Sequence, residues 1–248
     1  MCPFRGGRRV NARGEVKTPG TPAQAARREP LPREPFPLIL CAPTGTGKTT
    51  LARELLRRRA DVAFSVSVTT RPRRPGERDG VDYRFVSEHG FDRMRRGGEL
   101  LEWARVHRWH YGTPARNLRE AAAAGKHLVL DIDVQGARQV KRAVPSAVSV
   151  FLLPPSFAAW LARLEARASE DEAERRRRLR TGLSELEAVP EFDFVIVNDR
   201  LDDTVAALGA ILDAESRRVR RRRREVVRLR DELLEALRAY LAEGESGG

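Results

Sequence analysis

The sequence predicts an α/β fold in which a three-layer core with a parallel sheet carries a small α+β insertion. Three observations predict it: short apolar runs recur along the chain, helical segments separate them, and a glycine-rich turn directly follows the first run. Such apolar runs suit strands covered on both faces, and their alternation with helices favours a parallel sheet. With 248 residues, the chain can hold one such domain with inserted lobes.

The first strand is expected at residues 38–41, where an apolar run begins abruptly after a polar stretch. A helix over 48–59 follows the glycine-rich turn, and a second strand is expected at 62–68. Residues 67–113 are rich in turn residues and differ from both flanks, which is typical of an inserted unit. Its expected elements are an extended piece at 83–86, a helix at 88–96 and an extended piece at 100–106.

The core pattern resumes with a helix at 114–124, which Gly125 ends. Further strands are expected at 127–132, 148–153 and 194–197, and further helices at 134–142, 157–168 and 173–188. From Leu201 onward the pattern is helical, with an interruption at Arg220–Arg224. The arginine-rich segment 216–248 is expected to form an amphipathic helix that docks on the core; a dimerising or acidic-surface helix is the alternative.

The net charge of +12 is concentrated at the two ends of the chain. Residues 1–37 hold eight basic and three acidic side chains, and residues 216–248 hold ten and six. Residues 1–37 are rich in Pro, Gly and Arg without periodicity, so a flexible basic tail is expected there. A polyanion is one ligand that these ends could bind, but nucleic acid is not the expected partner of the protein.

Membrane and disulfide-bonded classes are not expected. No run reaches the roughly 18 apolar residues that a membrane span needs, and the first 30 residues lack the apolar segment of a signal peptide. The two cysteines, Cys2 and Cys41, lie in a polar tail and an apolar run, so reduced thiols are expected. A cytoplasmic location without membrane attachment follows as the expectation.

The glycine-rich turn Ala42–Thr49 matches the phosphate-binding loop pattern, except that Ala42 replaces its first glycine. Backbone N–H groups of such a loop converge on phosphate oxygens, Lys48 reaches the β- and γ-phosphates, and the Thr49 hydroxyl can bind magnesium. The position between a strand and a helix is the one that this mechanism needs. The predicted ATP-binding residues here are Pro43, Thr44, Gly45, Thr46, Gly47, Lys48, Thr49 and Thr50.

The phosphate loop does not indicate what accepts the phosphoryl group; the arginine-rich turn at Ser67–Glu77 is the segment that does. Arg71 and Arg74 follow a strand directly, and Tyr83 lies just beyond. Guanidinium pairs bind phosphate oxygens bidentately, and tyrosine hydroxyls can complete the shell. Taken alone, such a turn is more often a solvated loop, so its meaning depends on the rest of the pattern.

The whole arrangement over residues 38–212 resembles the guanylate kinase family. The resemblance rests on the phosphate loop, the Ser67–Glu77 stretch with Tyr83, and Asp-Ile-Asp-Val-Gln-Gly at 131–136, in the family's order and nearly its spacing. It implies a P-loop kinase core at 38–66, 114–155 and 190–215, a GMP-binding lobe at 67–113 and a helical lid at 156–189. None of the departures from the family pattern, such as Thr113 where Ser is frequent, removes a catalytic group.

The resemblance also implies roles for individual residues. The GMP-binding residues are Ser67, Arg71, Arg74, Glu77, Tyr83, Glu102, Tyr111, Thr113 and Asp133. Hydrogen-bond chemistry independently supports guanine recognition by the carboxylates of Glu102 and Asp133. A carboxylate can accept from the donors at guanine N1 and N2, whereas adenine offers an acceptor at N1. The lid arginines Arg163, Arg167 and Arg178 join Lys48 as catalytic groups, and Asn198 is expected near adenine. Asp131 belongs with Thr49 at Mg²⁺, through water; capping of the next helix is its alternative role.

The resemblance therefore implies an enzyme that transfers the γ-phosphoryl group of MgATP to GMP, and to dGMP, in purine nucleotide metabolism. Three alternatives differ from it: a catalytically inactive guanylate-kinase-like binding module, a nucleic-acid-binding protein that uses its arginine-rich ends, and a kinase for a phosphorylated sugar. The substrates ATP and GMP are the expected partners. The sequence leaves a monomer and a homo-oligomer equally open.

Overall fold

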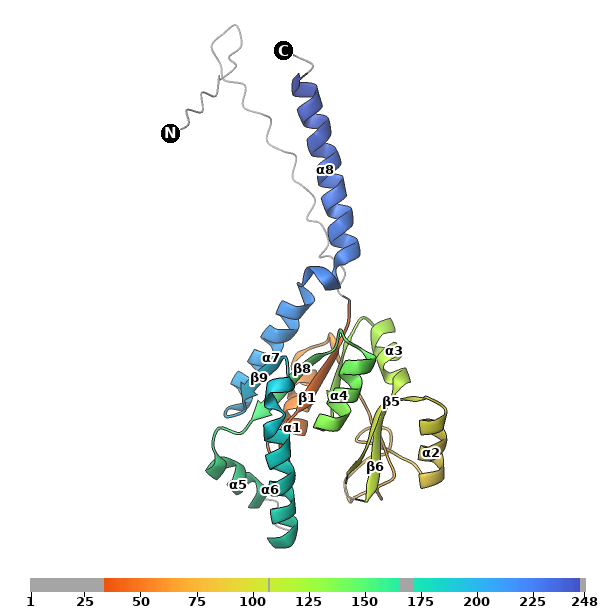
Figure 1. Ribbon diagram of the computed structural model, residues 1–248, viewed down its shortest axis with the longest axis vertical. Coiled ribbons are helices and arrows are strands. Elements are labelled where there is room, and N and C mark those ends of the chain that lie inside the picture. Colours follow the sequence, from red (N-terminus) through yellow and green to blue (C-terminus); the bar gives the residue numbers. More distant parts are fainter. Residues whose placement is uncertain (1–33, 107, 166–171, 246–248) are drawn as a thin grey trace. The chain divides into compact units, whose positions relative to one another are not determined.

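Two sheets organise the chain in the computed structural model, which describes residues 34–106, 108–165 and 172–245 (Figure 1). The larger sheet is parallel throughout. Its strands, in spatial order, are β2 (Val62–Phe64), β7 (His127–Asp131), β1 (Pro37–Cys41), β8 (Val148–Leu153) and β9 (Phe194–Val197). The smaller sheet is mixed. Its strands, in spatial order, are β4 (Arg84–Phe85), β3 (Val68–Thr69), β6 (Trp109–Pro114) and β5 (Leu100–Val106).

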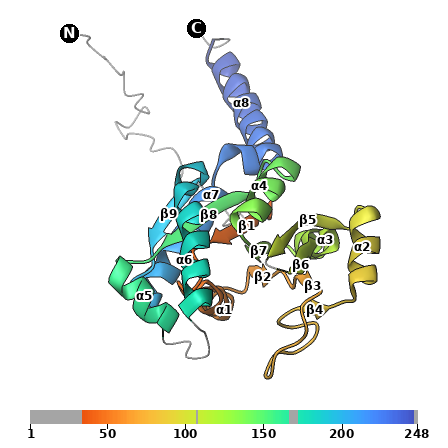
Figure 2. The same cartoon turned by 60° about the horizontal axis from the view of Figure 1, so that its bottom comes forward.

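Helices cover the larger sheet on both faces, because its strands are apolar on both sides. In β1, Leu38 and Leu40 pack in one buried cluster with side chains of α1 (Lys48–Arg58) and α7 (Leu201–Ser216). The intervening Ile39 packs in a second cluster with α3 (Ala115–Ala123) and α4 (Val134–Ala143). Figures 1 and 2 show these layers around β1 and β8. The predicted three-layer α/β fold with a parallel sheet is confirmed.

The remaining helices are α2 (Glu88–Arg96), α5 (Phe157–Glu165), α6 (Glu172–Glu187), α8 (Arg223–Glu245) and the short 3₁₀ turns η1 (Val189–Glu191) and η2 (Val219–Arg221). Of these, the C-terminal end of α6 and the turn η1 also pack against the second cluster, through Leu186 and Val189. The helix expected at 157–168 is described to residue 165, and its last three residues fall outside the described part. Residues 109–114, for which no strand was predicted, form β6 and hold the smaller sheet together.

The run at 62–68, predicted as one strand, is divided between the two sheets. Residues 62–64 pair with β7 in the larger sheet, and residues 68–69 pair with β4 and β6 in the smaller one. Asn117 of α3 holds the crossing point: its Nδ2 donates to the Ser65 hydroxyl and to the Val66 carbonyl, each at 3.0 Å. The prediction of one strand was wrong because this bend depends on a residue some 50 positions away.

Phe36, which the predicted tail boundary at residue 37 assigned to the tail, packs against the core. Phe36 is only 1% exposed, its N–H donates to His127 Nδ1, and the centre of its ring lies 3.9 Å from the Arg221 guanidinium carbon. Arg221 also pairs with the buried Glu215 at 3.1 Å. The strand therefore begins at Pro37, and residues 1–33 of the predicted tail lie outside the described residues.

The two ends of the C-terminal helical pattern behave differently. Helix α7 docks on the core through Val205, Leu208 and Leu212, whereas the expected docking of the segment beyond residue 216 is not observed for α8. Leu233 and Leu237 of α8 are 61% and 54% exposed. A 3₁₀ turn at η2, within the arginine run, separates the helices. In the described part of the chain, no helix combines the length and apolarity that crossing a membrane would require.

Candidate functional site

The phosphate-binding loop follows β1 and has a conformation that its glycines permit. Gly45 and Gly47 have φ values of 91° and 86°, in the region that residues with a Cβ atom rarely adopt. The Thr46 hydroxyl donates to the Pro43 carbonyl at 2.8 Å, which closes the turn from inside. Ala42, which replaces the pattern's first glycine, is buried directly after the end of β1 and is 6% exposed.

Lys48, Thr49 and Asp131 meet at the carboxyl end of β7, next to the loop. The Lys48 Nζ lies 2.9 Å from Asp131 Oδ1 and donates to the Ile132 carbonyl at 2.8 Å. The Thr49 hydroxyl donates to the second Asp131 oxygen at 2.9 Å. Burial disfavours the Lys48 charge, but the Asp131 carboxylate outweighs this cost and raises the pKa of Lys48. The three side chains thus form one charged cluster at the mouth of the loop.

Helix α5 and the end of β9 hold the loop from the other side. Trp160 Nε1 donates to the Thr44 carbonyl at 2.8 Å, and Asn198 Nδ2 donates to the Thr46 carbonyl at 2.6 Å. Arg163 Nη1 donates to the Asn198 carbonyl at 3.1 Å. The Asn198 amide oxygen accepts from Thr204, so both of its polar atoms are engaged within the protein. Contact of Asn198 with adenine stays a prediction.

Helix α6 contributes polar side chains to the hollow that the phosphate loop lines. Arg177, Arg178 and Glu185 all line it, whereas the predicted Arg167 lies outside the described residues. Glu185 was not predicted. Burial raises its pKa to about 7, with Lys48 opposing and Asp133 adding to the shift, and its Oε2 is buried without a hydrogen-bond partner among the described residues. No local pattern marks Glu185, because its environment arises only where α6 meets the loop.

The arginine-rich turn folds around the Arg71 guanidinium. Its Nη2 bonds to Glu77 Oε1 at 2.6 Å, its Nε donates to the Tyr111 hydroxyl at 3.2 Å, and the side chain is 7% exposed. Its guanidinium carbon also lies 5.5 Å from the Tyr83 ring centre. The Arg71 guanidinium lowers the pKa of Glu77 against the effect of burial. Arg74 is exposed and its backbone N–H donates to Glu77, so the predicted anion-binding groups lie together.

Glu102 is buried at the junction of β5, β6 and α4. Its Oε1 accepts from the Thr113 hydroxyl at 2.7 Å, and it is 4% exposed. Burial, with the Asp133 charge nearby, raises the pKa of Glu102 to about 7, although the Thr113 bond opposes the shift. Asp133 itself caps α4 by accepting from the Gly136 N–H at 2.8 Å. The two carboxylates predicted to recognise guanine therefore line one hollow, with Ser67 on its rim.

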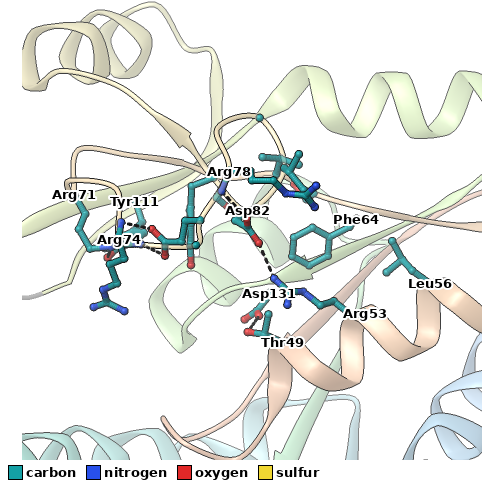
Figure 3. Close-up of a pocket in the computed structure, with 18 residues that line it drawn as sticks. Thr49, Arg53, Leu56, Phe64, Arg71, Arg74, Arg78, Asp82, Tyr111 and Asp131 are labelled. Carbon is teal, nitrogen blue, oxygen red and sulfur yellow. Dashed lines mark hydrogen bonds and ion pairs between the residues drawn. The ribbon is translucent and has the colours of Figure 1, made fainter. Parts of the chain in front are cut away.

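Two adjoining hollows contain these groups. One, of about 1080 Å³, runs from the phosphate loop to Glu102 and Asp133. The other, of about 880 Å³, lies between α1 and the arginine-rich turn. In Figure 3, Thr49 and Asp131 lie beside each other, while Arg71, Arg74 and Tyr111 gather at another part of this pocket. Both hollows share Thr49, Arg71 and Asp131, so the loop and the arginine-rich turn face a common space.

The donor atoms near the loop suit a hard divalent cation. A hydroxyl and a carboxylate oxygen meet at Thr49 and Asp131, and Mg²⁺ in such sites takes one or two protein oxygens while phosphate and water supply the rest. The described residues contain no group of three or more His, Cys, Asp or Glu side chains placed to hold a metal ion by themselves. The residues present therefore fit a cation that enters together with a phosphate ligand.

Comparisons with known proteins all indicate the same family. The family model described as guanylate kinase matches residues 34–215. A guanylate kinase from Chelativorans sp. (strain BNC1) is 47% identical over 186 residues, covering 75% of this chain and 85% of the relative. A guanylate kinase from Thermotoga maritima is 42% identical over 195 residues, covering 79% and 94%. The crystal structure of guanylate kinase from Anaplasma phagocytophilum has a TM-score of 0.64 at 34% identity, covering 77% of this chain and 91% of that one.

Proposed function

We propose a role for each site residue in the transfer of a phosphoryl group from ATP to GMP, on the premise that this chain belongs to the guanylate kinase family. The chain is an enzyme of this family, and the reaction gives ADP and GDP. The observation that supports the proposal most is the shared space between the phosphate loop and the arginine-rich turn. A donor and an acceptor bound at these two places would face each other.

On the donor side, the loop binds the ATP phosphates through backbone N–H groups and Lys48. Lys48 keeps its positive charge through the contact with Asp131 and moves to the β- and γ-phosphates when they enter. Thr49 and Asp131 would hold Mg²⁺, which would supply positive charge to neutralise the transferred phosphoryl group. Hydrogen bonds from Asn198 and from Trp160 of α5 to backbone carbonyls stabilise the conformation of the loop.

On the acceptor side, Arg71, Arg74, Tyr83 and Tyr111 bind the GMP phosphate, and Glu77 orients the Arg71 guanidinium. Guanine binds against Glu102, Asp133, Ser67 and Thr113. A carboxylate accepts from the donors at guanine N1 and N2, whereas adenine would leave it unpaired.

The smaller sheet and its loops, residues 67–113, act as a GMP-binding lobe on a core of 38–66, 114–155 and 190–215. Residues 156–189 act as a lid that brings Arg163, Arg167 and Arg178 to the polyphosphate. The lobe and the lid close on both substrates before transfer, which excludes water. No side-chain general base is required, because a GMP phosphate oxygen attacks the γ-phosphorus as an anion.

The test is a coupled assay of ADP formation from ATP with GMP, dGMP, AMP, CMP or UMP as the acceptor. Turnover is expected with GMP and dGMP, and it should stop with EDTA and return with Mg²⁺. Recovery with Mg²⁺ alone after chelation tests whether the reaction requires this cation. Binding of both nucleotides without turnover would instead identify an inactive binding module.

A further inference from the structure

The side chain of Gln139 fastens α4 to the backbone of β5 immediately beside Glu102. Gln139 Nε2 donates to the Trp103 carbonyl at 2.7 Å, and the Trp103 N–H donates to Gln139 Oε1 at 3.1 Å. Trp103 lies on β5, the edge strand of the smaller sheet. The amide of Gln139 thus takes the place that a neighbouring strand would occupy, because it offers one donor and one acceptor in the spacing of a peptide group.

The same face of α4 shapes the surroundings of the Glu102 carboxylate. Asp133, Gly136 and Gln139 are spaced three apart, so they lie on one face of the helix. A Cβ atom at Gly136 would lie 2.7 Å from Glu102 Oε2, so a side chain there would require the Glu102 carboxylate to shift. On this face, Asp133 therefore supplies the capping carboxylate, Gly136 leaves space for the Glu102 carboxylate, and the Gln139 amide holds Trp103 of β5.

We propose that Gln139 is a positioning residue for guanine recognition: it holds β5 at Trp103 so that Glu102 keeps the orientation in which it accepts from guanine N1 and N2. The proposal rests on the proposed guanine-binding role of Glu102. Gln139 need not touch the nucleotide. It acts through the backbone one residue away, and a shift of about 1 Å at such a site is enough to cost a large part of the recognition.

The role is specific to an uncharged amide of this length. Leucine at position 139 can make neither hydrogen bond, and glutamate keeps the acceptor for the Trp103 N–H but loses the donor to its carbonyl. Asp133 and Thr113, the other polar neighbours of Glu102, cannot replace it, since one caps α4 and the other is bonded to Glu102 itself. Selectivity for the base, rather than phosphate binding, should therefore depend on Gln139.

The experiment compares Gln139→Leu and Gln139→Glu with Arg142→Ala, an exposed substitution on the same helix. Steady-state kinetics are measured with GMP and with IMP, which lacks the N2 amine, and the KM for ATP is the internal control. For Gln139→Leu we expect about a tenfold higher KM for GMP, a smaller change for IMP, and a kcat and an ATP KM within twofold of wild type. The KM of Gln139→Glu for GMP should lie between those of wild type and Gln139→Leu. The kinetic constants of Arg142→Ala should match those of wild type.

A double-mutant cycle with Glu102→Gln separates positioning from general destabilisation. If Gln139 acts through Glu102, the preference of the double variant for GMP over IMP should equal that of Glu102→Gln alone. An unchanged preference in both Gln139 variants, or fully additive losses in the double variant, would overturn the positioning role while leaving Glu102 in its place. An unchanged preference in Glu102→Gln would instead overturn the guanine site and the positioning role together.

Discussion

The proposed donor side and the proposed acceptor side of the site are built in different ways. The donor side is one contiguous loop, Ala42–Thr49, whose shape is fixed by positive φ at two glycines and by an internal Thr46 hydrogen bond. The acceptor side gathers Arg71, Glu102 and Asp133 from a turn, a strand and a helix start. In the proposed site, phosphate binding by the loop therefore depends on the loop's backbone and one lysine, whereas selectivity for the acceptor depends on side chains from several elements.

The largest expected effect lies on the donor side. Lys48→Ala should lower kcat by about 10²- to 10³-fold or more, because the loop has no second side-chain cation to replace it at the β- and γ-phosphates. Circular dichroism should show a folded protein. Arg119→Ala is the matched control, since it removes an exposed positive charge from α3, which does not contribute to the loop. A Lys48→Ala variant with near wild-type turnover would refute the assignment of the loop.

A smaller, selective effect is expected on the acceptor side. Glu102→Gln should lower kcat/KM for GMP by about 10- to 100-fold at pH 8 while the KM for ATP stays nearly unchanged, because charged hydrogen bonds are worth roughly 1.5–3 kcal/mol. In wild type, the raised pKa of Glu102, about 7, means that the carboxylate form appears only as the pH rises through 7. The ratio of wild-type to variant kcat/KM should therefore grow between pH 6 and pH 8. A ratio that is constant with pH would contradict this ionisation.

The smallest effect concerns stability, at the junction of α6 with the loop. Glu185 has a folded pKa of about 7, above the ordinary value of 4.5, so its contribution to stability is fully present below 4.5 and is lost as the pH rises through 7. Glu185→Gln should thus gain free energy of unfolding relative to wild type between pH 5 and pH 8, by about 1–3 kcal/mol at most. Denaturant unfolding at both pH values measures it. A variant that loses stability at pH 8 would show that the carboxylate is favourably paired.

Sequence reasoning reached the parts of the molecule that local patterns determine. The phosphate loop, the apolar strands and α2 could be predicted, since each depends on residues within its own segment. The crossing of the chain from β2 to β3 could not, because Asn117 produces the bend from another helix. Phe36 was assigned to the tail for a similar reason: its burial depends on His127 and Arg221.

The candidate site divides in the same way. Residues within sequence motifs could be predicted, and the structure brings Lys48, Thr49 and Asp131 together. Glu185 and Gln139 carry no motif, and each gains its environment only when a helix packs against the loop or against β5. The leucines of α8 were expected to dock because their spacing is amphipathic, but spacing alone does not specify a partner surface.

Trp160 of α5 joins the phosphate loop to α6, and its fluorescence can report on this contact. Its indole N–H is bonded to the Thr44 carbonyl, and its ring covers Gly182 of α6, where a Cβ atom would come within 2.4 Å of it. Indole fluorescence depends on such hydrogen bonds and on the polarity around the ring. The other two tryptophans, Trp103 and Trp109, both lie in the smaller sheet. With those two replaced by phenylalanine, the tryptophan emission of the protein would come from Trp160 alone and would follow nucleotide entry into the loop without an added label.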